Sequence, residues 1–159
     1  MRRNSSGISP VVATVILVAI AIVIAIAVAF WASGLVGVFT RFEKLEITAV
    51  YAVPTGTTNQ YDITIIAKNT GSSSATVDKL LLNGVPICGI GAGGNWGTTG
   101  SAPTGFTIDS CGTPTATALN PGDQTQVTIR VTAPSAGVTV EVALHTASGK
   151  LYPYSVLLS

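Results

Sequence analysis

The chain has 159 residues, with charged side chains at only 9% of positions and a formal net charge of +1. This length leaves room for one ordinary domain with an appendage and excludes a large multidomain enzyme. So few charges exclude disorder driven by charge repulsion and an electrostatic nucleic-acid binder. One His and two Cys supply too few soft ligands for a zinc site built from these types alone. We therefore expect no metal and no nucleic-acid partner.

Residues 1–7, MRRNSSG, form a basic leader with two arginines and no acid. The positive-inside rule predicts that Arg2 and Arg3 stay in the cytoplasm and that the chain beyond the next apolar segment is exported. Asn4 begins the only Asn-x-Ser/Thr acceptor, and it lies in this leader, where an exported glycosylation machinery would not meet it.

Residues 8–40 form a hydrophobic segment, because no charged residue occurs between Arg3 and Arg41. The run ISPVVATVILVAIAIVIAIAVAFWASGLVGVF is apolar on every helical face, so the predicted helix has to be buried in lipid or in protein. It is longer than the about 20 residues that cross a bilayer. Pro10 suits the first helical turn. The segment is too long for a cleavable secretory signal, although hydropathy alone also fits a single-span membrane anchor.

Residues 41–159 have the pattern of an exported all-β domain. Short runs with period-two alternation are separated by Gly, Pro, Asn and Ser, which is typical of strands. About seven strands in about 115 residues predict an immunoglobulin-like sandwich, with a small barrel as the alternative. The fold class is therefore α+β, a lollipop-shaped chain with a long N-terminal helix. The expected strands are LEITAVYAV, QYDITIIAK, ATVDKLLLN, FTID, TQVTIRVT, GVTVEVALH and KLYPYSVLL.

The turn sequences NTGSS (69–73), Asn83-Gly84 and NPGD (120–123) favour antiparallel connections. The predicted strand surface is rich in Thr and Ser and poor in charge. Its hydroxyls could carry sugars, but Thr is also an ordinary strand residue.

Cys88 and Cys111 lie on the exported side and bracket a Gly-rich stretch. Because exported proteins meet oxidising conditions, we predict a disulfide between them, with two separate buried thiols as the alternative.

Gly89, Gly91 and Gly94 match the spacing GxGxxG of a dinucleotide-binding loop. No helical pattern follows them, so we interpret the segment as a surface loop and expect no cofactor. His145 has no second His nearby, and no GxSxG is present, so we expect no catalytic residues and no enzyme.

The leader ending in Gly7, followed by ISPVVATVILVAIAIVIAIAV and a β-rich domain, closely resembles archaeal type IV pilins. The resemblance is strongest over residues 1–40. It implies that a membrane prepilin peptidase cuts between Gly7 and Ile8. Bacterial type IV pilins usually carry Glu at the fifth mature position, which is Val12 here. The archaeal branch lacks this requirement, and archaellins share the same plan.

The resemblance implies a major subunit of an extracellular pilus for adhesion to surfaces or other cells. The precursor would wait in the cell membrane, and an assembly ATPase with its platform would drive it into a homopolymeric filament. The alternatives are an archaellin-type motility subunit and a single-span membrane-anchored binding module. As a hypothesis, small and β-branched residues would pack a central bundle of helices. They are Pro10, Ala13, Ile16, Ala19, Ala21, Ile24, Ala25 and Val28.

Overall fold

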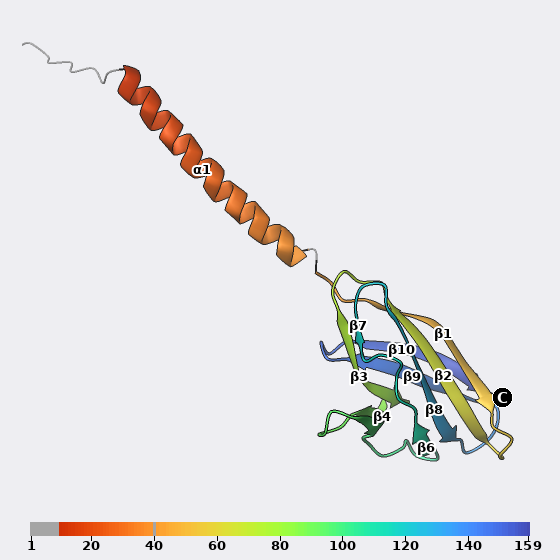
Figure 1. The fold of residues 1–159 in the computed structure, drawn as a ribbon. Helices are drawn as coiled ribbons and strands as arrows, with labels where there is room; N and C mark the ends of the chain where they lie inside the picture. The colour runs from red at the N-terminus through yellow and green to blue at the C-terminus, as the bar shows by residue number, and fades with distance from the viewer. Residues whose placement is uncertain (1–9, 40) are drawn as a thin grey trace, which may run out of the picture. The chain divides into compact units, whose positions relative to one another are not determined.

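The computed structural model describes residues 10–39 and 41–159, and the chain divides into two compact units, Met1–Arg41 and Phe42–Ser159. The first unit contains one helix, α1 (Pro10–Phe39), and the second consists of strands and turns (Figure 1). The strands are β1 (Leu45–Pro54), β2 (Gln60–Asn69), β3 (Ala75–Leu82), β4 (Val85–Ile90), β5 (Trp96–Thr98), β6 (Thr107–Cys111), β7 (Ala118–Leu119), β8 (Gln124–Thr132), β9 (Val138–Thr146) and β10 (Leu151–Leu158).

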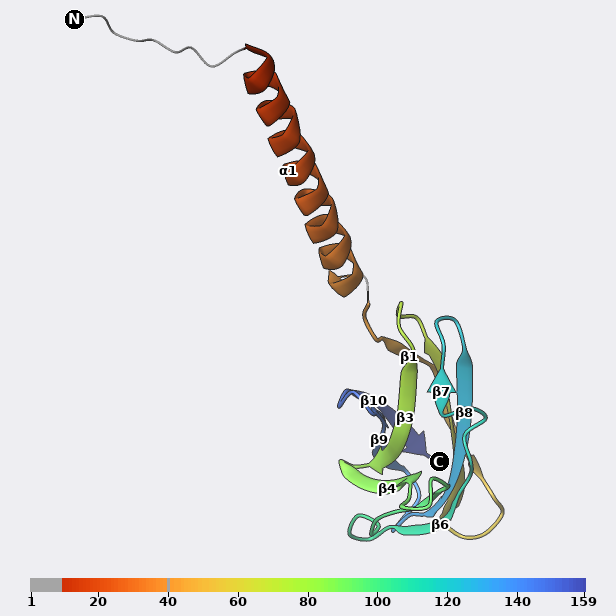
Figure 2. The ribbon, with the colours of Figure 1, turned by 60° about the vertical axis from the view of Figure 1, so that its left-hand side comes forward.

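The second unit is a sandwich of two antiparallel sheets, which the two ribbon views show face to face (Figures 1 and 2). One sheet has the order β1-β2-β8-β6, and the other has the order β10-β9-β3-β4-β5, with β7 paired to β3. At the open edges β1 lies near β10 and β5 lies near β6, but the described residues show no ladder between the sheets. The unit is therefore a sandwich, and the predicted α+β fold class is confirmed.

The core lies between the two sheets and is built by strand alternation. In β8, Val127, Ile129 and Val131 are at most 1% exposed, whereas the intervening residues face outward. Strand β9 buries Val140, Val142 and Leu144 in the same way. Each buried Val, Leu or Ile contributes about 1.5 to 3 kcal/mol to the stability of the fold. The largest fully buried side chains on the other strands are Ile63, Ile65, Val77, Leu80, Leu82, Ile87, Leu119 and Leu158.

Each of the seven predicted strand segments contains a strand, and the described residues form three more, β4, β5 and β7. Strand β4 contains Pro86, which lacks an amide donor, so its sequence is a weak strand signal. Strands β5 and β7 have only three and two residues, too few to show a period. The stretch after Cys88 is therefore partly strand, not wholly the surface loop that the sequence predicted.

Two of the predicted turns have the geometry that their residues favour. Asn83 and Gly84 have φ values of 49° and 78°, which is the type I′ pattern of a two-residue hairpin. In NPGD, Gly122 has a φ of 92° after Pro121, as in a type II turn. The Asp123 amide closes this turn on Asn120 O at 2.9 Å.

Candidate functional site

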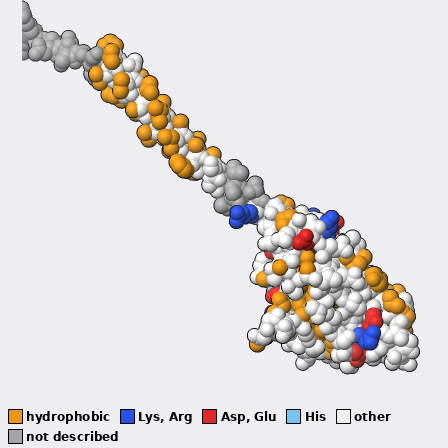
Figure 3. Space-filling view, viewed as in Figure 1, with side chains coloured by type: hydrophobic (Ala, Val, Ile, Leu, Met, Phe, Trp, Pro, Cys, Tyr) orange, Lys and Arg blue, Asp and Glu red, His pale blue; other side chains and the backbone are white. Residues whose placement is uncertain are grey.

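The helix α1 is the most unusual surface of the protein, because its side chains are exposed throughout residues 10–34. Its thirty residues contain no charge and correspond to about 45 Å of helix, more than the about 30 Å of a hydrocarbon core. The stretch Pro10–Gly34 is long and apolar enough to cross a membrane, and none of its most apolar window is buried. Figure 3 shows hydrophobic side chains along its visible face and charged ones on the β domain.

The two hydroxyl side chains of the helix are hydrogen-bonded inside it. Thr14 Oγ1 donates to Val11 O at 2.8 Å, and Ser33 Oγ donates to Ala29 O at 2.7 Å. Hydroxyls that bond to carbonyls of the preceding turn need no water. Pro10 is the first helical residue, where the missing amide has no helical acceptor in any case. The two hydroxyls therefore add no unpaired donor when this helix enters lipid or a bundle of other helices, and the indole N–H of Trp31, near its outer end, suits the interface between lipid and water.

A shallow groove on α1 is outlined by Ile26, Ala29, Phe30 and Ser33. These residues are spaced i, i+3, i+4 and i+7, which is the set that forms a hole for a knob from a facing helix. Two of the four are small, so a neighbouring side chain can approach the helix backbone between Ile26 and the exposed ring of Phe30. The groove was not predicted from the sequence, although the i, i+3, i+4 and i+7 spacing of these four residues is visible there.

All eight residues predicted for the filament core lie in α1 and are exposed. They are Pro10, Ala13, Ile16, Ala19, Ala21, Ile24, Ala25 and Val28. Their role in a bundle stays a prediction. The predicted cleavage residues Gly7 and Ile8 lie outside the described residues.

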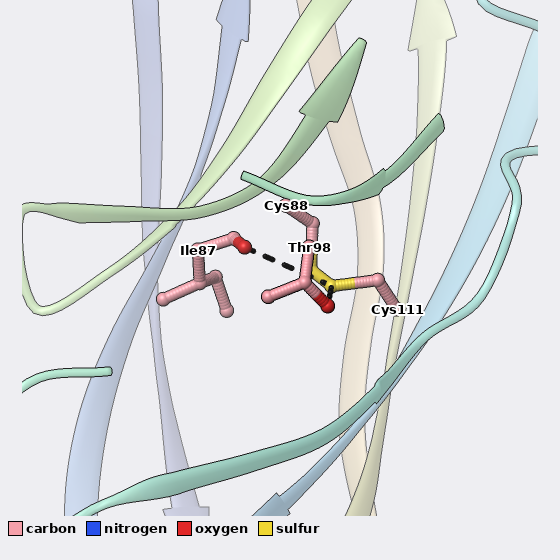
Figure 4. The surroundings of a disulfide bond; sticks show 4 residues. All are labelled: Ile87, Cys88, Thr98 and Cys111. Atoms are coloured by element: carbon pink, nitrogen blue, oxygen red, sulfur yellow. Dashed lines mark hydrogen bonds between the residues drawn. A yellow bond between two sulfur atoms is a disulfide. The ribbon is translucent and has the colours of Figure 1, made fainter. Parts of the chain in front are cut away.

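Cys88 and Cys111 are joined by a disulfide between β4 and β6 (Figure 4). Thr98 Oγ1 donates a weak hydrogen bond to Cys111 Sγ at 3.5 Å. Ile87 O lies 3.8 Å from the same sulfur. A disulfide sulfur carries no hydrogen, so this contact is packing. The link connects the two sheets at the end of the domain where β5 approaches β6.

The glycines of the GxGxxG match occupy the β4–β5 hairpin. Gly89 is in β4, and the Gly91 and Asn95 backbones close the turn, with the Gly91 amide donating to Asn95 O at 2.9 Å. A strand follows the turn in place of the helix N-terminus that would face a pyrophosphate.

In residues 10–39 and 41–159, no group of three or more His, Cys, Asp and Glu could hold a metal. His145 Nδ1 lies 2.5 Å from Asp78 Oδ1 across β9 and β3.

The outer face of the four-stranded sheet carries an ion pair. Arg130 Nε donates to Asp62 Oδ1 at 2.7 Å and Nη2 donates to Oδ2 at 2.8 Å, across directly opposed residues of β8 and β2. This bidentate hydrogen bond lowers the pKa of Asp62 and raises that of Arg130. Asp109 Oδ2 accepts from Thr132 Oγ1 and from Gln60 Nε2 nearby. This network was not predicted from the sequence.

No protein-family model and no curated protein matches the chain. Among solved structures, it is similar to the archaellum periplasmic stator complex FlaF and FlaG from Sulfolobus acidocaldarius, with 18% identity over 72% of this chain and 89% of that one, at a TM-score of 0.42. The archaellum periplasmic stator protein FlaG from the same organism is 18% identical over 72% of this chain and 99% of that one, at a TM-score of 0.43. The Iho670 flagellar-like filament is 17% identical over 96% of this chain and 99% of that one, at a TM-score of 0.30.

The structural neighbours thus include archaellum stator proteins and a flagellar-like filament. All TM-scores are below 0.5 and all identities are below 20%, so the function has to be argued from the residues of this chain. What the chain itself presents is an α+β plan, a long helix without charge followed by a disulfide-linked β-sandwich.

Proposed function

We propose that the chain is the major subunit of an extracellular archaeal pilus of the type IV pilin class, which polymerises through α1. The observation that carries the proposal is the helix, which is apolar on all faces, exceeds the length of one membrane crossing and has none of its most apolar window buried. A single-span anchor needs only about 20 such residues. A bundle of identical helices uses the full length and every face.

Processing explains how one helix can serve in both environments. In the precursor, Arg2 and Arg3 hold the N-terminus in the cytoplasm. Cleavage between Gly7 and Ile8 by a prepilin peptidase removes both arginines and leaves six basic against seven acidic side chains. It also removes two charges that an apolar bundle would accommodate only at high cost. An assembly ATPase with its platform then moves the helix from lipid into the filament, from one apolar solvent to another. The β domains form the outer sheath that contacts surfaces or other cells.

The decisive experiment is mass spectrometry and electron microscopy of filaments sheared from cells that express the chain. We expect abundant fibres whose subunit begins at Ile8. An intact Met1 confined to the membrane fraction would contradict the proposal and favour an anchored binding module.

A matched pair of leader variants tests the processing step. Gly7→Leu places a large side chain at the scissile bond and should leave uncut precursor in the membrane, whereas Asn4→Leu makes a comparable change away from that bond and should still give fibres. Normal filaments from Gly7→Leu would refute the cleavage site. Loss of swimming with adhesion unchanged, on deletion of the chain, would point to an archaellin-type subunit instead.

A further inference from the structure

The start of the β domain is held by the last residue of β2 and the loop that follows it, residues 69–73, which we call the clasp. Four consecutive amides of the clasp, residues 70 to 73, donate to two carbonyls of the entering chain. The Lys44 oxygen accepts from Thr70 at 2.9 Å and Gly71 at 3.1 Å. The Phe42 oxygen accepts from the next two amides at 2.9 and 3.2 Å. The Phe42 amide donates in return to Ser72 Oγ at 3.1 Å.

The clasp is itself fixed by a buried asparagine. Asn69 is fully buried, and its Nδ2 donates to Ser73 O at 2.8 Å and to Leu119 O at 2.9 Å. Its Oδ1 accepts from the Gly71 amide at 2.9 Å. Because a buried polar group without partners is costly, these three bonds set the conformation of the clasp.

The entering chain passes so close to the clasp that only glycine fits at position 71. A Cβ on Gly71 would lie 2.5 Å from Phe42 O and 2.6 Å from Lys44 N, and both are backbone atoms that cannot swing aside. The carbonyl between these two, Glu43 O, accepts a hydrogen bond from a different part of the chain. Lys150 Nζ, in the turn after β9, donates to it at 2.7 Å. Three successive carbonyls, at residues 42 to 44, are therefore all bonded before β1 begins.

We propose that the clasp and Lys150 carry mechanical load between the helix and the sandwich. Any force on an exported β domain reaches α1 through a single covalent connection, which enters the domain at Phe42. Strand β1 lies at the edge of its sheet and has ladder bonds to β2 alone, starting at Leu45 opposite Asn69. Tension at residue 42 would act on this edge strand first. The clasp places bonds from two distant parts of the chain ahead of that first pair.

Limited trypsin digestion of the full chain in detergent tests whether the clasp closes this segment. Cleavage after Lys44 requires the clasp to open, whereas cleavage after Lys79 requires the central strand β3 to open. When opening is fast relative to cleavage, the rate follows the open population. Gly71→Ala should speed the cut after Lys44 about tenfold, because its Cβ would press on Phe42 O and Lys44 N and cost hydrogen bonds of the clasp, and it should leave the cut after Lys79 unchanged. Gly93→Ala is the control, because nothing lies within 4 Å of its Cβ.

Lys150→Met removes only the bond to Glu43 O and leaves the clasp loop intact, so it should give a smaller rise at Lys44 alone. An unchanged rate after Lys44 in both variants would overturn the clasp. So would an equal rise after Lys79, because the substitutions would then act on the whole domain.

Single-molecule pulling tests the load-bearing step directly. The full chain is anchored by its helix in a nanodisc and is pulled from a peptide tag inserted after the exposed Ser135. We expect a lower first rupture force for Gly71→Ala and Lys150→Met than for the wild type and Gly93→Ala. Equal forces would overturn the proposal. The biological use of such a clasp rests on the proposed filament, but both assays use isolated chains, so failure to assemble filaments would leave their result standing.

Discussion

Cys88 and Cys111 connect the two sheets of the sandwich, with Cα atoms 5.9 Å apart and a sequence separation of 23. Their strands, β4 and β6, share no ladder, so at this position the sheets are linked covalently and by side-chain packing. Cys88 is fully buried in the core. The bond therefore closes a Gly-rich segment that has few large apolar side chains of its own.

Replacing both cysteines by serine should lower the free energy of unfolding by about 3 to 4 kcal/mol, the chain-entropy value for a loop of this length. The measurement is chemical unfolding of the full chain in detergent, with and without reductant. Reductant should destabilise the wild type and leave the double variant unaffected. A wild type that is equally stable in reductant would show that the loop is held by packing alone.

The sequence predicted best those features that depend on the burial or backbone conformation of single residues. Alternation in β8 correctly placed Val127, Ile129 and Val131 in the core, since the side-chain period of a strand is fixed. Asn83-Gly84 correctly marked a hairpin, because few other residues adopt two successive positive φ values. The absence of charge between Arg3 and Arg41 likewise indicated a helix without a polar face.

Features that depend on pairing between distant strands were not predictable in this way. Asp62 and Arg130 are 68 residues apart, and they meet only because β2 pairs with β8 in one particular register. NTGSS was correctly predicted as a turn. Its hydrogen bonds to the segment after Arg41 depend on the pairing of β1 with β2, which the sequence does not specify. The apolar faces of α1 could indicate only that the helix needs an apolar environment, because a helix without a polar face carries no signal for a particular neighbour.

The Asp62–Arg130 pair should make the stability of the domain depend on pH in acid. Because hydrogen bonding to Arg130 lowers the pKa of Asp62, its contribution is fully present above the unfolded pKa and is lost as the pH falls through the folded value. Asp62→Asn should therefore destabilise the domain slightly at pH 7 and have less effect at pH values below about 4. The effect is small because both side chains are partly exposed.

Urea unfolding at both pH values measures this difference, and a double-mutant cycle with Arg130→Gln isolates the pair. A penalty for Asp62→Asn that is equal at pH 7 and in acid would show that the carboxylate charge contributes nothing.

The β3–β4 hairpin should depend on Gly84, whose φ of 78° is strained for other residues. Gly84→Ala should cost about 1 kcal/mol or more, although its Cβ would meet nothing within 4 Å, because the penalty comes from the backbone and not from a clash. Gly97→Ala is the matched control, since that Cβ is equally free and its φ is not positive. Thermal unfolding of the three chains gives the comparison, and equal midpoints would mean that the turn relaxes to another type.

The helix should tolerate a charge in the membrane better than in a filament. A carboxylate near the centre of a membrane helix costs about 3 kcal/mol on insertion scales, because the bilayer can deform and admit water around it. A close-packed bundle has no such freedom, and it repeats the buried charge in every subunit. Ala21→Glu should therefore leave precursor in the membrane fraction and abolish fibres. Ala147→Glu makes the same change at an exposed turn of the β domain and should assemble normally. Electron microscopy of sheared fractions, with the membrane fraction blotted in parallel, separates the two steps, and fibres of normal abundance from Ala21→Glu would rule out a core built from α1.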